Sequence, residues 1–331
     1  MTARPSPSTV SHAPWGPLGL EDFLAVLRGT RCTLAQMEYV AEQPFTSEGF
    51  SGHRVRTALW EGIQALDEAD CDPQAAFLLR EARALLPRDP PEVRSGVNAW
   101  PYVLGVQAEG IDLPPGGTLE IAVLLFGEAA ETWPAWALGG RELKLGRRSL
   151  RLRSMLVAGR DGAMTAWKGG AVAGGMVTLG DLCPPAVDVA QDLLAIDLLT
   201  PARKRRKDAA GEWVDDDLLN EGTLLKFLRA LYPRLQAVAR ADLQCAVRES
   251  LEQTAARIPV VVDETSWATV THRGKPFGGR IGRFICHGPI EPLLPLLTIG
   301  QLTHVGSEST WGLGRYGLTG CAAALEGEEP G

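Results

Sequence analysis

The sequence lacks the features that would place the chain in a membrane or bind a metal. No apolar run within its 331 residues approaches the roughly 18 residues that a membrane-spanning helix needs. Its six cysteines form no C-x-x-C pair, and a single Cys-His neighbour pair occurs, at Cys286–His287, so their spacing predicts no zinc site. We expect no metal, no cofactor, no membrane partner and a reducing, cytoplasmic location.

The charge is low in sum but uneven along the chain. A net charge of −7 argues against a protein coated all over in nucleic acid. It does not exclude a local basic groove, because the position of charges matters more than their sum. Cations gather in the segments 141–153, 203–207 and 265–290, and acids gather in 61–72, 212–221 and 326–329. This separation favours a basic groove; the alternative is a set of solvated loops, the common fate of charge runs.

Glycine is abundant near the end of the chain, in "LTHVGSESTWGLGRYGLTG" at 302–320. Gly312, Gly314 and Gly317 there spell G-x-G-x-x-G, the pattern of a dinucleotide-binding turn. That turn must follow a first strand, open a helix and precede a further strand with an acidic residue about 20 positions on. After Gly317 the chain has only "LTGCAAALEGEEPG", so the pattern does not indicate a dinucleotide site.

The order of the predicted elements indicates an α+β protein with two tandem ferredoxin-like (RRM-like) domains and antiparallel sheets. Each half of the chain reads strand, helix, strand, strand, helix, strand. In the first half these are 33–45, 53–69, 98–104, 114–127, 128–138 and 147–157. In the second half they are 186–201, 222–239, 258–272, 278–288, 290–302 and 312–318. The two halves share no obvious sequence repeat.

Composition and element order together predict the domain boundaries. Residues 1–30 form an extension, Pro/Ser-rich and partly disordered, and residues 31–160 form the first ferredoxin-like domain. A linker spans 161–185. The second domain, which ends in the glycine-rich loop, spans 186–320, and a tail follows at 321–331.

Several blocks resemble a known family. "HVGSESTWGLG" at 304–314 resembles the glycine-rich signature of the RAMP superfamily of CRISPR-associated proteins, with His304 where a further glycine is common. The longer segment "PFGGRIGRFICHGPIEPLLPLLTIGQLTHVGSESTWGLGRYGL" and the "LLTPARKRRKDAAGEW" block resemble the CRISPR precursor-crRNA processing endoribonucleases. The same family is also matched by three blocks of the first half: "PYVL", "PPGGTLEIAVLLFG" and the arginine-rich strand at 147–153.

The resemblance implies a function. It implies an endoribonuclease that binds CRISPR repeat RNA and cleaves precursor crRNA without metal, leaving 2′,3′-cyclic phosphate and 5′-hydroxyl ends. Other Cas effector subunits are further possible partners. The alternative is a non-catalytic RAMP subunit that holds crRNA in an effector complex, because that superfamily contains inactive members with the same fold.

Metal-free cleavage needs a group that takes the 2′-hydroxyl proton, a group that protonates the leaving oxygen, and cations for the phosphorane. Histidine suits proton transfer near neutral pH. The family's catalytic histidine lies on or just after the first long helix, which points to His53, with Arg56 holding phosphate. The structural alternative for His53 is a surface residue that caps this helix. The chain has five histidines: His12, His53, His272, His287 and His304.

The expected RNA contacts lie in the second half. Glycines in the signature allow close approach of another chain, and exposed N–H groups there would form an anion-binding nest. The alternative is a tight packing loop between domains. The residues expected to bind RNA are Arg203, Lys204, Arg205, Arg206, Lys207, Arg280, Arg283, Gly306, Gly312, Gly314 and Arg315.

Overall fold

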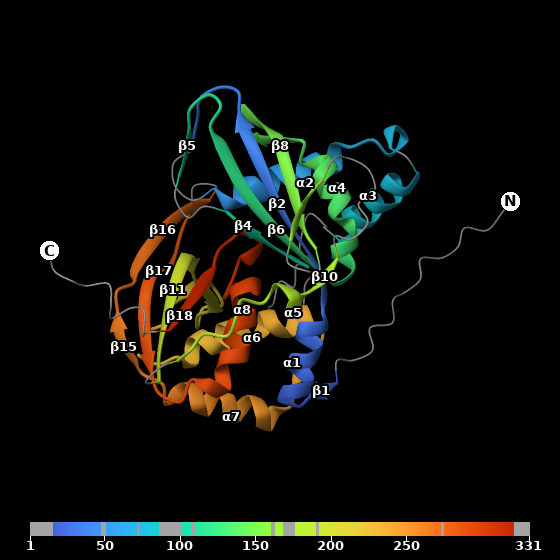
Figure 1. Ribbon diagram of the computed structural model, residues 1–331. Helices are drawn as coiled ribbons and strands as arrows, with labels where there is room; N and C mark the ends of the chain where they lie inside the picture. The colour runs from blue at the N-terminus through green and yellow to red at the C-terminus, as the bar shows by residue number, and fades with distance from the viewer. Residues whose placement is uncertain are drawn as a thin grey trace.

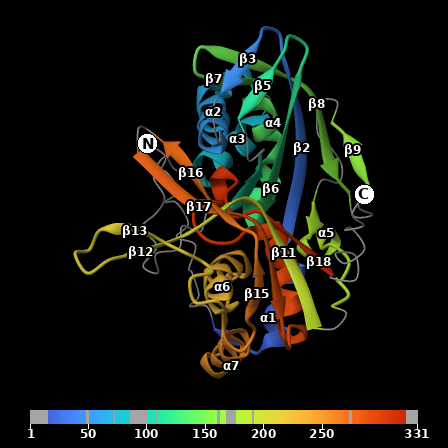
Figure 2. The same cartoon turned by 90° about the vertical axis from the view of Figure 1, so that its left-hand side faces the viewer.

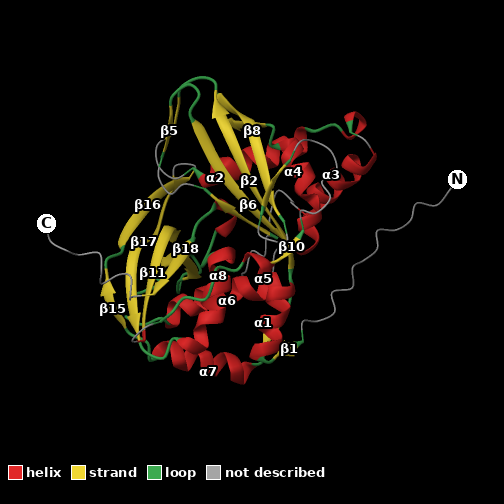
Figure 3. Ribbon diagram, in the orientation of Figure 1, coloured by secondary structure: helices red, strands yellow, loops and turns green. Residues whose placement is uncertain are grey.

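A computed structural model shows two α+β lobes, one built from each half of the chain (Figure 1). In each lobe the helices lie on one face of an antiparallel sheet (Figure 3). Among the helices that the structure describes, none is both long and apolar enough to cross a membrane. The described residues are 16–47, 51–71, 73–85, 101–106, 110–159, 163–167, 176–189, 192–272 and 275–320.

The N-terminal sheet has the strand order of a ferredoxin-like fold. Its first strand, β2, lies between β6 and β8, and all of these neighbours are antiparallel. Two short strands pair outside this order: β10 with the start of β2, and β9 with the end of β8. In sheet order the main strands are β4 (Tyr102–Gly105), β6 (Thr118–Phe126), β2 (Arg31–Ala41), β8 (Arg148–Ala158) and β7 (Glu142–Leu145), and the additions are β9 (Met164–Ala166) and β10 (Val177–Thr178).

Helices cover one face of this sheet because alternate strand residues are apolar there. Met37 of β2 and Ile121 of β6 point toward the helices and are 1% exposed. The helices are α2 (Gly52–Ala65), α3 (Pro73–Leu85), α4 (Trp133–Gly139) and the short 3-10 helices η1 (Glu68–Asp70) and η2 (Gly127–Thr132). A small separate sheet pairs β3 (Phe45–Ser47) with β5 (Ile111–Leu113).

The C-terminal sheet repeats the same topology. Its first strand, β11, lies between β17 and β18, and β15 and β16 both pair with β17. The strands are β11 (Leu193–Ala202), β15 (Val260–Asp263), β16 (Ser266–His272), β17 (Lys275–His287) and β18 (Tyr316–Gly320), and the helices are α6 (Leu225–Ala239), α7 (Cys245–Ala256), α8 (Leu294–Thr303) and the turn η4 (Glu291–Leu293). The prediction of two ferredoxin-like domains is confirmed.

One core joins the two lobes. Leu124 and Phe126 at the end of β6 point away from the N-terminal helices and pack in the same cluster as the C-terminal helices. The helix α1 (Leu20–Gly29), although first in the chain, packs there too through Phe23 and Leu27, both fully buried (Figure 1). A parallel pair of two-residue strands, β1 (Pro17–Leu18) and β14 (Asp242–Leu243), fixes its start. The N-terminal segment therefore contributes to the C-terminal lobe.

Some elements differ from the sequence-based expectation. A strand that was not predicted, β12 (Lys204–Lys207), contains all of the "RKRRK" run except Arg203. It pairs with β13 (Trp213–Asp216) in a hairpin that projects from the lobe (Figure 2). β11 begins at Leu193, not at residue 186, and ends at Ala202, one residue past the predicted end at Pro201. Pro295 falls in the first turn of α8, where a missing N–H costs nothing, so that helix begins after the turn η4. Both sheets also exceed the four strands expected.

Candidate active site and nucleic-acid interface

The glycine-rich loop of the C-terminal lobe docks on the N-terminal lobe. Its turn η5 (Ser309–Trp311) packs against α2 and β4. Gly312 has a φ of +86°, and a Cβ there would lie 2.9 Å from the carbonyl oxygen of Leu104 on β4. Only glycine combines this backbone conformation with so close an approach. The loop therefore forms part of the contact between the two domains.

The glycine N–H groups of this loop already have acceptors within the chain. Gly314 N–H donates to the carbonyl of Pro201 at 3.0 Å, Gly312 to Ser309 at 2.9 Å and Gly306 to Ala230 at 3.3 Å. The expectation that these amides are exposed and form an anion nest is therefore wrong. The loop has the geometry of the alternative interpretation, a tight packing loop between the two domains. RNA contact by Gly306, Gly312 and Gly314 stays a prediction.

The close packing of Gly306 gives a first prediction. Its φ is +80°, and a Cβ there would lie 2.0 Å from the carbonyl oxygen of Arg203. We expect Gly306→Ala to lower the free energy of unfolding by at least about 2 kcal/mol, from backbone strain and overpacking combined. Gly317 is the matched control, because a Cβ there meets no atom within 4 Å. Urea unfolding of both variants measures this, and equal stabilities would contradict the packing role of Gly306.

His53 is the second residue of α2, directly beside the glycine-rich loop. Its ring centroid lies 6.1 Å from that of Trp311, at an interplanar angle of 59°. The side chain is half-buried, and its Nδ1 is buried. Exchange of a proton with a bound strand would therefore run through Nε2. His53 thus lies where a helix of one domain meets the signature loop of the other.

Arg56 lies one helical turn after His53, and residues three apart share a helix face. Its Nε–H donates to the hydroxyl of Tyr102 on β4 at 2.9 Å. Burial raises the pKa of Tyr102 although Arg56 stands beside it, so this phenol stays neutral and accepts the hydrogen bond. On the same helix Arg54 donates to the hydroxyl of Ser47 at 2.9 Å. The start of α2 therefore carries one histidine and two arginines held by hydroxyl groups.

Two further basic residues at this domain contact are buried. Arg234 of α6 is 3% exposed; its Nη2 donates to the carbonyl of Tyr102 at 2.8 Å and its Nε to that of Thr303 at 3.2 Å. His304 is 4% exposed, with its Nδ1 3.2 Å from the carbonyl of Leu313. Burial and the neighbouring cations Arg234 and Arg315 lower the pKa of His304 to about 3. His304 is therefore neutral at physiological pH and serves the packing of the loop.

The basic run faces acids across its own hairpin. Arg203 is 4% exposed, bonds Asp215 at 2.7 Å and lies 3.6 Å from Glu308 in the glycine-rich loop. Arg205 also reaches Glu308, at 3.7 Å, and Arg206 lies 3.8 Å from Asp216. These ion pairs tie the hairpin to the signature loop.

Exposure separates the members of this run. The side chains of Arg205 and Arg206 are 38% and 58% exposed, so they remain accessible to a strand, whereas Arg203 is enclosed. Lys204 is half-buried, and desolvation lowers its pKa. Lys207 pairs with Trp213 through the backbone, and its side chain lies outside the described residues.

The remaining candidate cations lie on or beside the C-terminal sheet. Arg280 bonds Asp217 at 2.7 Å and Asp263 at 3.3 Å, and Arg283 bonds Asp197 at 2.7 Å. Arg315 is exposed, while its backbone bonds Thr200 in β11. Arg280, Arg283 and Arg203 are thus held by carboxylates, whereas Arg315 is exposed. RNA binding by this group stays a prediction.

The separation of acids from cations along the chain does not persist in space. The acids of 212–221 lie directly opposite the basic run, because β12 and β13 form a hairpin. The inference of a basic groove from that separation is therefore wrong for this cluster. Sequence reasoning also missed Trp311 beside His53, Tyr102 beneath Arg56 and Glu308 between two arginines. The sequence does contain a turn signal, "DAAGE", between Lys207 and Trp213. A hairpin at this turn predicts that the basic run pairs with the acidic residues that follow it.

By its fold this is an α+β protein with two tandem ferredoxin-like domains that meet at a glycine-rich loop. Residues 196–316 match the model of the family described as CRISPR-associated endoribonuclease Cas6. A search of curated proteins gives no match. The resemblance stated from the sequence is confirmed over residues 196–316, the part of the chain that the family model matches.

Solved structures with Cas6 in their titles share the fold over most of this chain. A Cas6 product complex (TTHB231) is 16% identical, with a TM-score of 0.55, over 87% of this chain and 98% of that one. A second protein, titled CRISPR associated protein Cas6, is 11% identical, with a TM-score of 0.52, over 86% and 98%. A chain of a partial Cas6-RT-Cas1–Cas2 complex is 14% identical, with a TM-score of 0.57, over 89% of this chain and 47% of that one.

Proposed function

We propose that this protein binds CRISPR repeat RNA and cleaves precursor crRNA, without metal, to give 2′,3′-cyclic phosphate and 5′-hydroxyl ends. The observation that carries the proposal is the position of His53 against Trp311, where the first helix of one domain meets the signature loop of the other. The family match over residues 196–316 supports the same activity. The product complex among the similar structures agrees with an RNA substrate.

His53 acts as the general base in this proposal. Its Nε2 takes the proton of the 2′-hydroxyl, and the 2′-oxygen attacks the adjacent phosphorus. The bond from phosphorus to the 5′-oxygen breaks, and a general acid protonates that oxygen. Arg56 and Arg54 flank the position and stabilise the charge that develops on the phosphorane oxygens. Tyr102 holds Arg56 in place through its hydroxyl.

The test is cleavage of cognate repeat RNA in EDTA, with analysis of the product ends. We expect one cut, a product that carries a 2′,3′-cyclic phosphate and a partner with a 5′-hydroxyl. Loss of cutting in EDTA, restored by magnesium, would overturn the metal-independent mechanism. If the protein binds the repeat but never cuts it, it is instead a non-catalytic subunit that holds crRNA. Other Cas subunits, as in the Cas6-RT-Cas1–Cas2 complex, are then its expected partners.

The exposed cations of the basic hairpin give a prediction about RNA affinity. Each phosphate contact contributes about −0.7 to the log–log slope of affinity against salt for a single strand. If Arg205 and Arg206 each contact one phosphate, changing both to alanine flattens that slope by about 1.4. Arg203→Ala is a poor probe because that side chain is enclosed. Binding measured across a salt series decides: an unchanged slope would show that the hairpin contacts no phosphate.

A further inference from the structure

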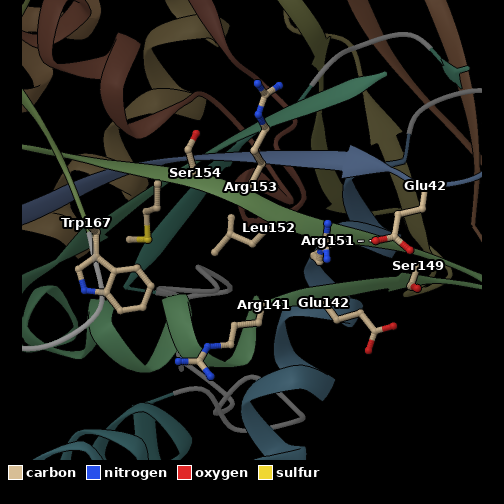
Figure 4. A pocket seen from close by; sticks show the side chains of 10 residues that line it. Glu42, Arg141, Glu142, Ser149, Arg151, Leu152, Arg153, Ser154 and Trp167 are labelled. Atoms are coloured by element: carbon tan, nitrogen blue, oxygen red, sulfur yellow. Dashed lines mark ion pairs between the residues drawn. The ribbon is translucent and has the colours of Figure 1, made fainter. Parts of the chain in front are cut away.

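A pocket opens at the outer edge of the N-terminal sheet, and its lining includes none of the residues of the proposed cleavage site. Along this edge β7 pairs with β8 up to Arg151, and β9 pairs with it from Leu156 onward. The stretch of β8 between them has neither neighbour. A cavity of about 700 Å³ lies along this gap (Figure 4).

Backbone hydrogen bonds close the two ends of the gap. The N–H of Leu152 donates to the carbonyl of Arg141 at 2.8 Å, and the N–H of Trp167 donates to the carbonyl of Met155 at 2.8 Å. The backbones of Arg141 and Trp167 are therefore fixed by β8 at the two ends of this gap. The backbone of the sheet edge therefore fixes the position of the pocket, which is not formed by long exposed side chains alone.

The wall and floor of the pocket are aromatic and apolar. Trp167 lines it, and its ring meets that of buried Trp133 edge-on, with centroids 6.1 Å apart and planes at 85°. This contact holds the indole in one orientation. Leu152 of β8 forms the apolar floor beside it (Figure 4). Met155 of the same strand is a further apolar residue of the lining. A flat ring is the ligand shape that such a wall and floor accept.

The rim carries three arginines, Arg141, Arg151 and Arg153, together with two carboxylates, Glu42 and Glu142. Arg151 lies 3.4 Å from Glu42, and Arg153 lies 3.7 Å from Glu38, so each has a carboxylate to neutralise it. Arg141 also lines the pocket and is exposed, and it makes no ion pair within the described part of the chain. Its guanidinium group is thus the one best placed to receive an anion from a ligand.

An aromatic wall beside an unneutralised guanidinium selects for a flat ring that carries a negative charge. Nucleobases stack on tryptophan whatever their sequence, and arginine binds phosphate through paired N–H groups. An inorganic anion would leave the indole unused, and an apolar ligand would leave Arg141 unused. A nucleotide uses both.

We propose that this pocket binds one unstacked nucleotide from the single-stranded RNA next to the repeat stem, with its base on Trp167 and its phosphate on Arg141. The proposal rests on the proposed function, because the RNA strand is the source of the nucleotide. A free nucleoside monophosphate has the same base and phosphate as a nucleotide within RNA, so the experiment must distinguish these two ligands.

The experiment compares the affinities of two uncleavable repeat RNAs, each with a 2′-deoxy nucleotide at the cut position. One has the stem alone, and the other has a single-stranded extension on either side. For the wild type we expect the extension to raise affinity by on the order of tenfold, the size of one base–aromatic stack. Trp167→Ala and Arg141→Ala should each lose most of that gain and bind the stem alone as the wild type does. Arg147→Ala is the matched control, because Arg147 is an exposed arginine beside the same strand but does not line the pocket.

The outcomes separate the two proposals. If the wild type binds no repeat RNA, both the proposed function and the pocket proposal are overturned. If it binds the stem but gains nothing from the extension, and adenosine monophosphate does not bind either, the pocket proposal is overturned alone. Adenosine monophosphate that binds the wild type but not Arg141→Ala, without any gain from the extension, assigns the pocket to a free nucleotide. Arg141→Ala keeps this test valid even if Trp167→Ala fails to fold.

Discussion

His53→Ala is expected to slow single-turnover cleavage of a repeat RNA by about 10²–10⁴-fold, the usual contribution of a general base. The affinity for RNA should stay nearly unchanged, because His53 is half-buried against Trp311 and is one contact among many. Arg56→Ala should also slow cleavage, through loss of charge beside the phosphate. The rates are measured with enzyme in excess, so that product release does not limit them.

His287→Ala is the matched control for His53→Ala. His287 is exposed at the end of β17 in the other domain, and we expect its replacement to leave cleavage unchanged. If His53→Ala cuts as fast as the wild type, His53 only caps α2. In that case His287, or His272 at the end of β16, becomes the candidate base.

Arg234→Met is expected to lower the free energy of unfolding by about 2–4 kcal/mol. The buried guanidinium donates to the carbonyls of Tyr102 and Thr303, and the substitution removes both of these charge-assisted hydrogen bonds, worth roughly 1.5–3 kcal/mol each. Part of that loss is offset because burying the cation is itself costly, as the lowered pKa of Arg234, about 10, indicates. Since Tyr102 also holds Arg56, cleavage should fall as well.

Arg229→Met is the control for Arg234→Met. Arg229 lies on the same helix, α6, but is 44% exposed and bonds Glu252 at the surface. Exposed ion pairs contribute about 0–1 kcal/mol, so this change should be nearly neutral. Urea unfolding of the two variants compares them directly. If Arg234→Met is as stable as Arg229→Met, the buried arginine does not hold the two domains together.

The sequence predicted the fold well because its strongest patterns are local. The alternation of Leu119, Ile121, Val123 and Leu125 indicates a strand, and the apolar spacing of α6 indicates a helix, whatever the rest of the chain does. The order of such elements then restricts the topology to two ferredoxin-like units. The place of α1 was not predictable, since nothing local reveals that Phe23 and Leu27 pack among helices about 200 residues later.

The candidate site was predicted less completely because its contacts join distant parts of the chain. The meeting of His53 with Trp311, and of Arg56 with Tyr102, depends on how the two domains dock. The basic run was assigned to a groove from charge along the sequence, but in the fold its acidic neighbours lie across a hairpin. Glu308, between two arginines, adopts a left-handed backbone that no sequence pattern marks.

The most direct test of the account is cleavage of a repeat RNA that carries a single 2′-deoxy nucleotide at the cut position. The proposed reaction uses that 2′-hydroxyl as the nucleophile, so the account predicts no cut at that position and binding as tight as for the unmodified RNA. Continued cutting at the same phosphate would require water or another nucleophile, and would contradict the assignment of this site as a cyclic-phosphate-forming endoribonuclease.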